Sequence, residues 1–300
     1  MVLSGKFFLE ILNKLRRKIR RSLVAFSDFA YRRELLLRAQ MGRGKVRPVA
    51  RRESIVVSLT SYQERMPYLH LCLESLLSQD MQPSRVVLWL AEGTVIDSSN
   101  RRLISGQIKR GLEIRYCEDL RSYKKFFFAF QEFSNSLVVT ADDDFMYPKN
   151  WLSSLIDSYQ KCPEYLHCHR AHYIEKNSAN EIMPYSSWDW LSPGIIGPSH
   201  RLFVTTGAGA VFNPRLFSKE VFNREIFEKL CPTADDVWIN AMLLMNGIKC
   251  QKVQKNTIHL PQIAEMHDEK RLSLVNVENG SNDLQIKKIL NYYDLYRKIN

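Results

Sequence analysis

Runs of β-branched and aliphatic residues recur four times between residues 54 and 141 of this 300-residue chain. They are SIVVSLT at 54–60, RVVLWLA at 85–91, LEIRY at 112–116 and LVVTA at 137–141. Segments with helical spacing of apolar residues lie between them, at 67–79 and 123–133. Continuous apolar strands that alternate with helices are typical of a parallel sheet covered on both faces. The sequence therefore predicts an α/β fold.

Polar side chains stand at the ends of two of these runs. Thr60 ends the first run and Tyr62 lies two residues beyond it, and Asp142, Asp143 and Asp144 follow the fourth run. Right-handed crossovers bring the carboxyl ends of parallel strands to one edge of the sheet, where open α/β sheets bind ligands. No glycine-rich dinucleotide fingerprint follows the first run and no Walker loop is present, which disfavours Rossmann dehydrogenases and P-loop kinases.

The three consecutive aspartates favour a bound cation. Carboxylates a few ångströms apart repel one another, and one of them takes up a proton unless a positive charge is near. Oxygen-only ligands select Mg²⁺ or Mn²⁺, and such an ion stabilises a diphosphate as it leaves. The alternative is a solvated acidic turn before a helix that begins near Pro148.

Three segments together resemble a known family. They are SLTSYQER, LLSQDMQPSRVVLWLAE and VVTADDDFMYPKNWL, and they resemble the nucleotide-sugar-binding half of GT-A glycosyltransferases. The nearest group is the inverting family 2 enzymes of bacterial lipopolysaccharide and capsule synthesis, and the resemblance covers residues 54–283. It implies a Rossmann-like, mixed and mostly parallel sheet flanked by helices. It also implies metal-dependent transfer of a sugar from a nucleotide-sugar donor to a saccharide or lipid-linked acceptor.

The resemblance also implies roles for the residues at the sheet edge. The donor base and ribose lie near Thr60 and Tyr62. The D-x-D element falls on the aspartate triplet and binds the donor together with Mn²⁺ or Mg²⁺. Because the triplet permits two registers, direct metal coordination falls on Asp143 or on Asp144, with Asp142 on the donor side.

The donor half departs from the family pattern at one position and leaves another open. The family often has an aspartate for the base after the second strand, and Glu92 stands there in this chain. Lys124 and Lys125 lie where the family has a basic residue near the donor, and a lysine there balances the diphosphate charge. The alternative is an ordinary helix start with Asp119 and Ser122 as cap residues.

The acceptor half is expected to contain the catalytic base. Residues 232–238 (PTADDVW) precede an apolar helix, and in the resembling family an acidic pair at a helix start supplies the base. Asp236 matches that position and Asp235 is the alternate; a carboxylate there removes the proton of the attacking hydroxyl. The alternative is a helix N-cap at Asp235. Upstream, Gly207 and Gly209 permit close backbone approach to a sugar, or mark a tight turn.

Histidines and tryptophans give weaker signals. By fold analogy, His259, in a predicted strand, is a candidate metal ligand beside the aspartates. The cluster HCHRAH at 167–172 has no partner pair at zinc-finger spacing, and ordinary partly buried histidines are expected there. Trp188 and Trp190 either stack on a sugar ring or pack in the core.

Basic residues are concentrated at the N-terminus. Residues 1–52 contain 15 lysines and arginines against three acids, whereas the rest of the chain contains 28 against 29. The main domain has no basic excess, so no nucleic-acid partner is expected. Within the N-terminal segment, apolar residues from Phe8 to Phe26 recur every three or four positions beside a cationic face. This pattern predicts an amphipathic helix on an anionic membrane surface or, alternatively, against a protein.

These observations predict the domain organisation and the location of the protein. The stretch 40–52, rich in Gly, Pro and Arg, indicates a linker. We expect a basic amphipathic arm and linker at 1–52 and a GT-A domain at 53–300. The charges that interrupt every apolar run exclude a signal peptide or a membrane span. The resemblance, together with the placement of the basic residues, implies a cytoplasmic enzyme on the inner face of the membrane.

Two other functions remain open at the level of sequence. A metal-dependent nucleotidyltransferase also needs a carboxylate-bound metal beside an α/β sheet, but it releases pyrophosphate. A non-catalytic, membrane-associated sugar-binding scaffold would need neither acidic cluster for chemistry. The six cysteines are scattered without a C-x-x-C pair, which disfavours a zinc knuckle or a disulfide framework.

Overall fold

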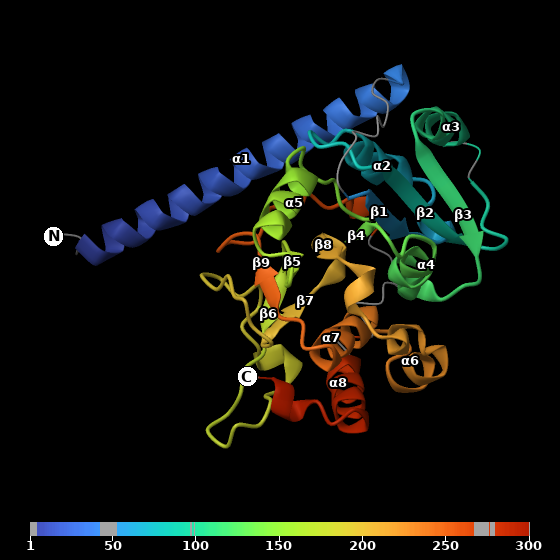
Figure 1. The fold of residues 1–300 in the computed structure, drawn as a ribbon. Helices are drawn as coiled ribbons and strands as arrows, with labels where there is room; N and C mark the ends of the chain where they lie inside the picture. The colour runs from blue at the N-terminus through green and yellow to red at the C-terminus, as the bar shows by residue number, and fades with distance from the viewer. Residues whose placement is uncertain are drawn as a thin grey trace.

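A mixed seven-stranded sheet forms the centre of the molecule in the computed structural model, which describes residues 5–42, 53–96, 98, 100–266, 276 and 280–299 (Figure 1). The strand order is β3 (Leu112–Cys117), β2 (Arg85–Ala91), β1 (Ile55–Thr60), β4 (Leu137–Ala141), β8 (Ala210–Phe212), β5 (Leu166–Cys168) and β9 (Cys250–Lys252). β1 to β4 are mutually parallel, as predicted, and β8 is antiparallel to both β4 and β5. The predicted α/β class with a mostly parallel sheet is confirmed.

Helices cover both faces of this sheet. Alternate residues of a strand point to opposite faces, so Val56 joins one buried cluster while Ile55 and Val57 join the other. The first cluster includes residues of α4 (Lys124–Glu132), α6 (Arg224–Leu230), α7 (Asp235–Met245) and α8 (Ser281–Tyr292). The second includes residues of α1 (Gly5–Met41), α2 (Leu69–Leu77), α3 (Arg101–Lys109) and α5 (Trp151–Lys161). A small sheet of β6 (Ala171–Tyr173) and β7 (Leu202–Val204) extends the first layer.

The order of the strands creates the place for a site. The chain leaves β1 toward β2 on one side and later returns to β4 on the other side of β1. The loops that follow β1 and β4 therefore diverge, and open α/β sheets bind ligands in the crevice at such a reversal. Tyr62 follows β1 and Asp142 follows β4, so both lie beside this crevice.

Helix α1 has two parts that differ in their surroundings. Its C-terminal part packs on the domain: Leu35 is fully buried, the Tyr31 hydroxyl donates to the carbonyl of Tyr147 over 2.6 Å, and Arg32 pairs with Glu265. Its N-terminal part extends away from the other elements (Figure 1). Most of the predicted linker, residues 43–52, lies outside the described residues. In the described ranges no helix has the length and apolarity needed to cross a membrane.

One helix was not predicted from the sequence, and one predicted strand is absent from the structure. Helix α3 was not predicted, because its amphipathic pattern is short and is interrupted by Gly106. The strand predicted around His259 is absent; this residue lies in an irregular segment, and its ring nitrogen is 2.9 Å from the carboxylate of Asp28 in α1. The residues that follow pair only locally in the described structure: Gln262 forms an isolated bridge with Phe145, and the carbonyl of Pro261 accepts from the amide of Met146.

Candidate functional site

A cleft of about 970 Å³ opens at the carboxyl ends of β1 and β4. Of the eleven predicted site residues, nine line it: Thr60, Tyr62, Lys124, Lys125, Asp142, Asp143, Asp144, Asp235 and Asp236. Glu92 and His259 do not line it. The two acidic clusters, which are more than ninety residues apart in the sequence, therefore share one cleft.

A buried lysine joins these two clusters. The ammonium of Lys125, from the first turn of α4, donates to Asp142 Oδ1 over 2.8 Å and lies 3.1 Å from Asp235 Oδ2. Burial disfavours the charged form of Lys125, but Asp142, Asp235 and Asp236 outweigh burial and raise its pKa. The lysine is therefore a fixed positive charge beneath the cleft, and its role here is to neutralise carboxylates.

The second aspartate of the triplet has a complete set of partners. Asp143 is buried, and its two carboxylate oxygens accept from the Ser61 hydroxyl over 2.5 Å and from the Arg65 guanidinium. Arg65 also donates from Nε to the hydroxyl of Tyr62 over 2.9 Å. Asp143 thus fixes the loop after β1, which holds Tyr62, against the end of β4.

The third aspartate retains a free oxygen. Asp144 Oδ1 is buried and has no hydrogen-bond donor among the described residues, while Oδ2 lies 3.4 Å from Arg65. Burial, and then the neighbouring charges of Asp142 and Asp143, raise the pKa of Asp144 to about 7. An acceptor without a donor, next to two other carboxylates, is the environment that a cation stabilises.

A divalent ion fits this arrangement through one direct carboxylate. Mg²⁺ is commonly held by one or two carboxylates together with substrate phosphates and water. Asp144 offers the free oxygen, whereas Asp143 is already bonded to Ser61 and Arg65. No cluster of three or more His, Cys, Asp or Glu side chains with metal-site geometry occurs in the described parts of the chain. The phosphates of a ligand would thus have to supply much of the coordination.

The second acidic cluster lies at the start of α7. Asp236 Oδ1 accepts from the backbone amide of Thr206 over 2.9 Å and from its hydroxyl over 2.7 Å. Burial, and then the charge of Asp235, raise the pKa of Asp236 to about 6. The helix N-cap is Ala234, so the alternative reading of Asp235 as the N-cap is wrong. A carboxylate with a pKa of about 6 that faces a cleft is suited to accept a proton near neutral pH.

The remaining predicted residues have local partners. The ammonium of Lys124 is 2.6 Å from Asp119 Oδ1, and the Thr60 hydroxyl donates to the carbonyl of Trp89 over 2.9 Å. Glu92 is exposed beyond the end of β2, outside the cleft, so its predicted contact with a donor base has no support from the structure. His259 is likewise exposed and bonded to Asp28, away from the aspartates, which corrects its prediction as a metal ligand.

The structure adds an arginine that the sequence reasoning missed. Arg170 lines the cleft, its Nε donates to the Thr205 hydroxyl over 2.6 Å, and its guanidinium lies 5.6 Å from the centre of the Phe145 ring. None of the carboxylates in the described ranges forms a salt bridge with it. Arg170 stands between His169 and His172 in the sequence, and no motif there marks it as a ligand-binding residue. A guanidinium without a carboxylate in such a cleft is suited to bind phosphate.

The backbone opposite the triplet comes unusually close. A Cβ atom added to Gly207 would lie 1.6 Å from Asp142 Oδ2, so no larger residue fits there without moving this carboxylate. Gly209 has φ +114° and would place a Cβ 2.4 Å from Trp151 Nε1. The backbone at these two glycines therefore lies close to the side chains of Asp142 and Trp151, which explains the need for glycine at both positions.

Aromatic residues form the wall of the cleft next to Arg170. His172, Tyr185, Trp190 and Phe203 line it together. Trp188 is only 4% exposed and packs in the core, whereas Trp190 is 42% exposed. The two readings open for this pair therefore separate: core packing holds for the first tryptophan and exposure to the cleft for the second.

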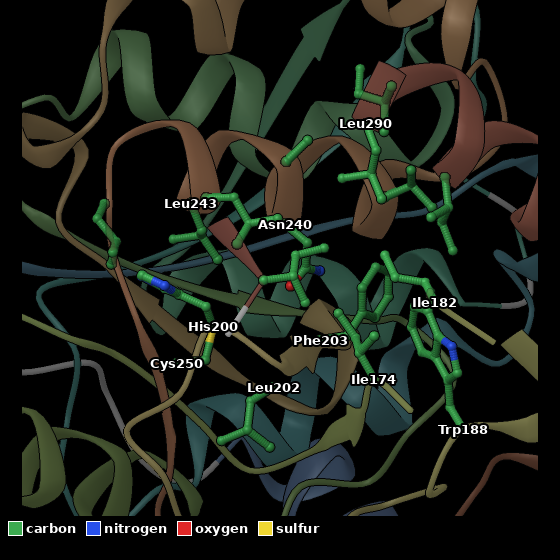
Figure 2. A pocket seen from close by; sticks show the side chains of 17 residues that line it. Ile174, Ile182, Trp188, His200, Leu202, Phe203, Asn240, Leu243, Cys250 and Leu290 are labelled. Atoms are coloured by element: carbon green, nitrogen blue, oxygen red, sulfur yellow. The ribbon is translucent and has the colours of Figure 1, made fainter. Parts of the chain in front are cut away.

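A second hollow lies between β7, α7 and α8 (Figure 2). It is lined almost entirely by apolar side chains, among them Ile174, Leu243 and Leu290, and it holds only about 20 Å³. That volume accommodates about one water molecule and no sugar or nucleotide. The large polar cleft is therefore the candidate site.

Comparisons with known proteins give distant structural similarities alone. No protein-family model matches the chain, and no curated protein sequence matches it. Similar solved structures include the mannosyltransferase PcManGT from Pyrobaculum calidifontis in complex with GDP-Man and Mn²⁺, at 17% identity, over 77% of this chain and 64% of that chain, with a TM-score of 0.42. Others are CMP:2-keto-3-deoxy-manno-octonic acid synthetase complexed with CTP (9% identity, 67% and 89% coverage, TM-score 0.40) and TarS from S. aureus in complex with UDP (13%, 68% and 59%, 0.44). This chain spans less than two thirds of the mannosyltransferase and of TarS, and at these scores its function has to be argued from the site.

Proposed function

We propose that this protein is a metal-assisted glycosyltransferase that moves a sugar from a nucleotide-sugar donor to a hydroxyl group of a saccharide or lipid-linked acceptor. The observation that carries the proposal is the shared cleft of the two acidic clusters. Asp144 offers a free carboxylate oxygen on one side, and Asp236 has a raised pKa on the other. Sugar transfer needs both: a cation for the leaving diphosphate and a base for the attacking hydroxyl.

The donor side of the cleft is proposed to hold the nucleoside diphosphate. Asp144 would hold Mn²⁺ or Mg²⁺, and Arg170 would pair with a phosphate oxygen. When bound, the ion would neutralise negative charge on the diphosphate leaving group. Tyr62, fixed by Arg65 beside the end of β1, is the candidate for contact with the nucleoside.

The acceptor side is proposed to activate the attacking oxygen. As the acceptor oxygen forms its bond to the anomeric carbon, the bond from that carbon to the diphosphate oxygen breaks. The proton of the acceptor hydroxyl passes to Asp236, and the diphosphate leaves with the bonding electron pair. Direct displacement of this kind inverts the anomeric configuration. The amide and hydroxyl of Thr206 hold Asp236 Oδ1, so Oδ2 is the oxygen left to take the proton.

We also propose that the N-terminal part of α1 binds an anionic membrane surface. Leu15, Ile19, Leu23 and Phe26 are 51–72% exposed and repeat at helical spacing, with lysines and arginines between them. In a helix that lies on a membrane surface, apolar side chains enter the interface and the neighbouring cations meet anionic headgroups. This would place the enzyme on the cytoplasmic face of a membrane, near a lipid-linked acceptor of surface polysaccharide synthesis.

Vesicle co-sedimentation tests the membrane proposal. We expect the protein to bind vesicles with 30% phosphatidylglycerol and not pure phosphatidylcholine, and Leu23→Ser with Phe26→Ser to weaken binding at least tenfold. Tyr116→Ser, at an exposed apolar residue on β3, is the matched control and should bind as the wild type does. Equal binding by the double variant would contradict the proposed membrane contact.

Product analysis tests the transfer reaction. The protein is incubated with a methyl pyranoside as acceptor and with UDP-glucose, UDP-N-acetylglucosamine or GDP-mannose as donor, each with Mn²⁺ and with Mg²⁺. The released phosphate compounds are then separated by chromatography. We expect a nucleoside diphosphate from at least one donor and no pyrophosphate. With a nucleoside triphosphate and a sugar phosphate supplied instead, release of pyrophosphate would indicate a nucleotidyltransferase and overturn the proposal.

A further inference from the structure

One aromatic side chain of the cleft is exposed although its neighbours are buried. Trp190 is 42% exposed, and its ring centre lies 4.6 Å from that of His172 and 5.5 Å from that of Tyr185. His172 and Tyr185 are 4% and 6% exposed. The indole therefore packs against two buried rings and is still partly exposed in the cleft. A large apolar surface that is held rigidly in a concave polar site is typical of ligand recognition.

The loop that carries this tryptophan is held in an unfavourable backbone conformation. Leu191 and Ser192, directly after it, have φ values of +63° and +40°. Residues with a Cβ atom rarely adopt this region, because the side chain then crowds the backbone. Such strain persists only when the surroundings enforce it. The backbone amide of Leu191 donates to Nδ1 of His172 over 3.0 Å, which fixes one side of the loop.

A buried lysine fixes the other side. Lys252, in β9, is fully buried, and its ammonium donates to the carbonyls of Leu191 and Ser192 over 2.7 and 2.8 Å. It also donates to the Ser192 hydroxyl and to the carbonyl of Lys255. No carboxylate of the described residues forms a salt bridge with it. A buried ammonium that bonds only to uncharged oxygen atoms of a loop is destabilising by itself, which points to a need for this loop shape.

The tryptophan lies on the side of the cleft that holds the proposed base. Its ring neighbours come from β6 and from residues 185–187, in the second half of the chain. Burial raises the pKa of the Tyr185 hydroxyl, and the nearby charge of Asp236 raises it further. Of the residues proposed for the donor, Tyr62 and Asp144 come from the loops after β1 and β4, whereas Arg170 directly precedes β6 and lies between them and the aromatic wall in sequence.

We propose that Trp190 is the platform on which a pyranose ring of the acceptor stacks, and that Lys252 is the positioning residue that holds this platform in place. The inference rests on the proposed function and narrows the acceptor to a sugar ring. One face of a pyranose presents C–H groups, which pack on the negative face of an indole, while its rim of hydroxyls suits a polar cleft. Stacking there would present an acceptor hydroxyl on the side of Asp236.

Fluorine NMR of protein labelled with 5-fluorotryptophan tests the platform. The chain has five tryptophans, and Trp190→Phe assigns the resonance of interest. The probes are methyl α-glucopyranoside, methyl β-galactopyranoside and methyl α-mannopyranoside, and separately UDP and GDP with Mn²⁺. We expect the Trp190 resonance to shift saturably with at least one pyranoside, and Trp190→Ala to weaken that binding about tenfold. No shift with any pyranoside, or a shift with nucleotides alone, would overturn the platform.

A pair of lysine variants tests the positioning role. Lys252→Met keeps the length of the side chain and removes the ammonium, whereas Lys255→Met changes an exposed lysine of the same segment. We expect Lys252→Met to move the Trp190 resonance without ligand and to weaken pyranoside binding about tenfold, with the control unchanged in both. A lower unfolding temperature with an unmoved resonance and unchanged affinity would reduce Lys252 to a structural residue and overturn its role.

The titrations with UDP and GDP distinguish failure of this inference from failure of the proposed function. Pyranoside binding at Trp190 without any nucleotide binding would support the platform and contradict the glycosyltransferase. Nucleotide binding without a response of Trp190 to any pyranoside would support the glycosyltransferase and contradict the platform.

Discussion

Replacement of Lys125 by methionine should destabilise the protein strongly and in a pH-dependent way. The ammonium lies 2.8 Å from Asp142 and 3.1 Å from Asp235 and is 3% exposed. Opposite charges at about 3 Å attract by roughly 5 kcal/mol at an effective dielectric constant of about 20, which the cost of burying them partly offsets. Loss of one partner of a buried pair typically costs about 3–5 kcal/mol. Because the Asp142 side chain is 35% exposed and regains hydration, we expect a loss of about 3 kcal/mol at pH 7.

The pH dependence identifies the cause of that loss. Burial opposes ionisation of Asp142, but Lys125 holds the pKa of this carboxyl below its ordinary value. In the wild type the ion pair of Lys125 and Asp142 therefore stabilises the fold at pH values above the ordinary pKa of an aspartate. This contribution is lost as the pH falls through the lowered pKa that Asp142 has in the folded protein. In the variant, the carboxylates without a counter-charge take up protons at mildly acidic pH. The difference in unfolding free energy should thus fall by more than half between pH 7 and pH 4.5.

Urea denaturation followed by far-ultraviolet circular dichroism measures both quantities. Lys124→Met is the matched control, since Lys124 is equally buried but its partner Asp119 has a side chain that is 60% exposed and readily rehydrated. We expect that variant to lose about 1 kcal/mol or less. A loss for Lys125→Met that is below 1 kcal/mol, or that is the same at both pH values, would refute the electrostatic reasoning.

Three further predictions concern the cleft. With saturating metal, the rate of sugar transfer should rise as the pH passes through about 6 and then stay constant, because Asp236 must be ionised to accept a proton. In the same steady-state assay, Asp236→Asn should lower kcat by about 10²–10⁴. Gly207→Ala should abolish transfer, since its Cβ would displace the Asp142 carboxylate, whereas Gly106→Ala, with no atom within 4 Å of the added Cβ, should retain wild-type rates. Arg170→Gln should weaken binding of a nucleoside diphosphate about tenfold or more by calorimetry, and unchanged affinity would remove Arg170 from the donor site.

The parallel half of the fold was predictable because its signals are local. The run LVVTA was expected at 137–141 and is β4 with the same bounds, and β1 differs from its expected range by one residue. These strands are buried on both faces, so apolar residues run through them almost continuously, with Ser58, Thr60 and Thr140 as the polar positions. β8 could not be predicted in this way: it has three residues, follows two glycines, and takes its antiparallel direction from strands that are far away in the sequence.

The residues of the cleft were predictable as candidates but their partners were not. The position at a strand end marks Asp142 in the sequence, and the resemblance to GT-A glycosyltransferases marks Asp236. The sequence could not choose between a helix start and a donor contact for Lys125, because one of its partners, Asp235, is 110 positions further along the chain. The sequence predicts a strand around His259, and only the fold shows that this residue meets Asp28 of α1 instead.

Calorimetric titration of UDP and GDP, with and without Mn²⁺, tests the central claim most directly. It is performed on the wild type, on Asp144→Asn and on Asp157→Asn, an exposed aspartate of α5 that serves as the control. We predict that at least one nucleotide binds in the presence of Mn²⁺ to the wild type and the control, and that Asp144→Asn removes the effect of the metal. Absence of binding by both nucleotides under every condition, or metal-dependent binding that Asp144→Asn leaves intact, would contradict the proposed donor site.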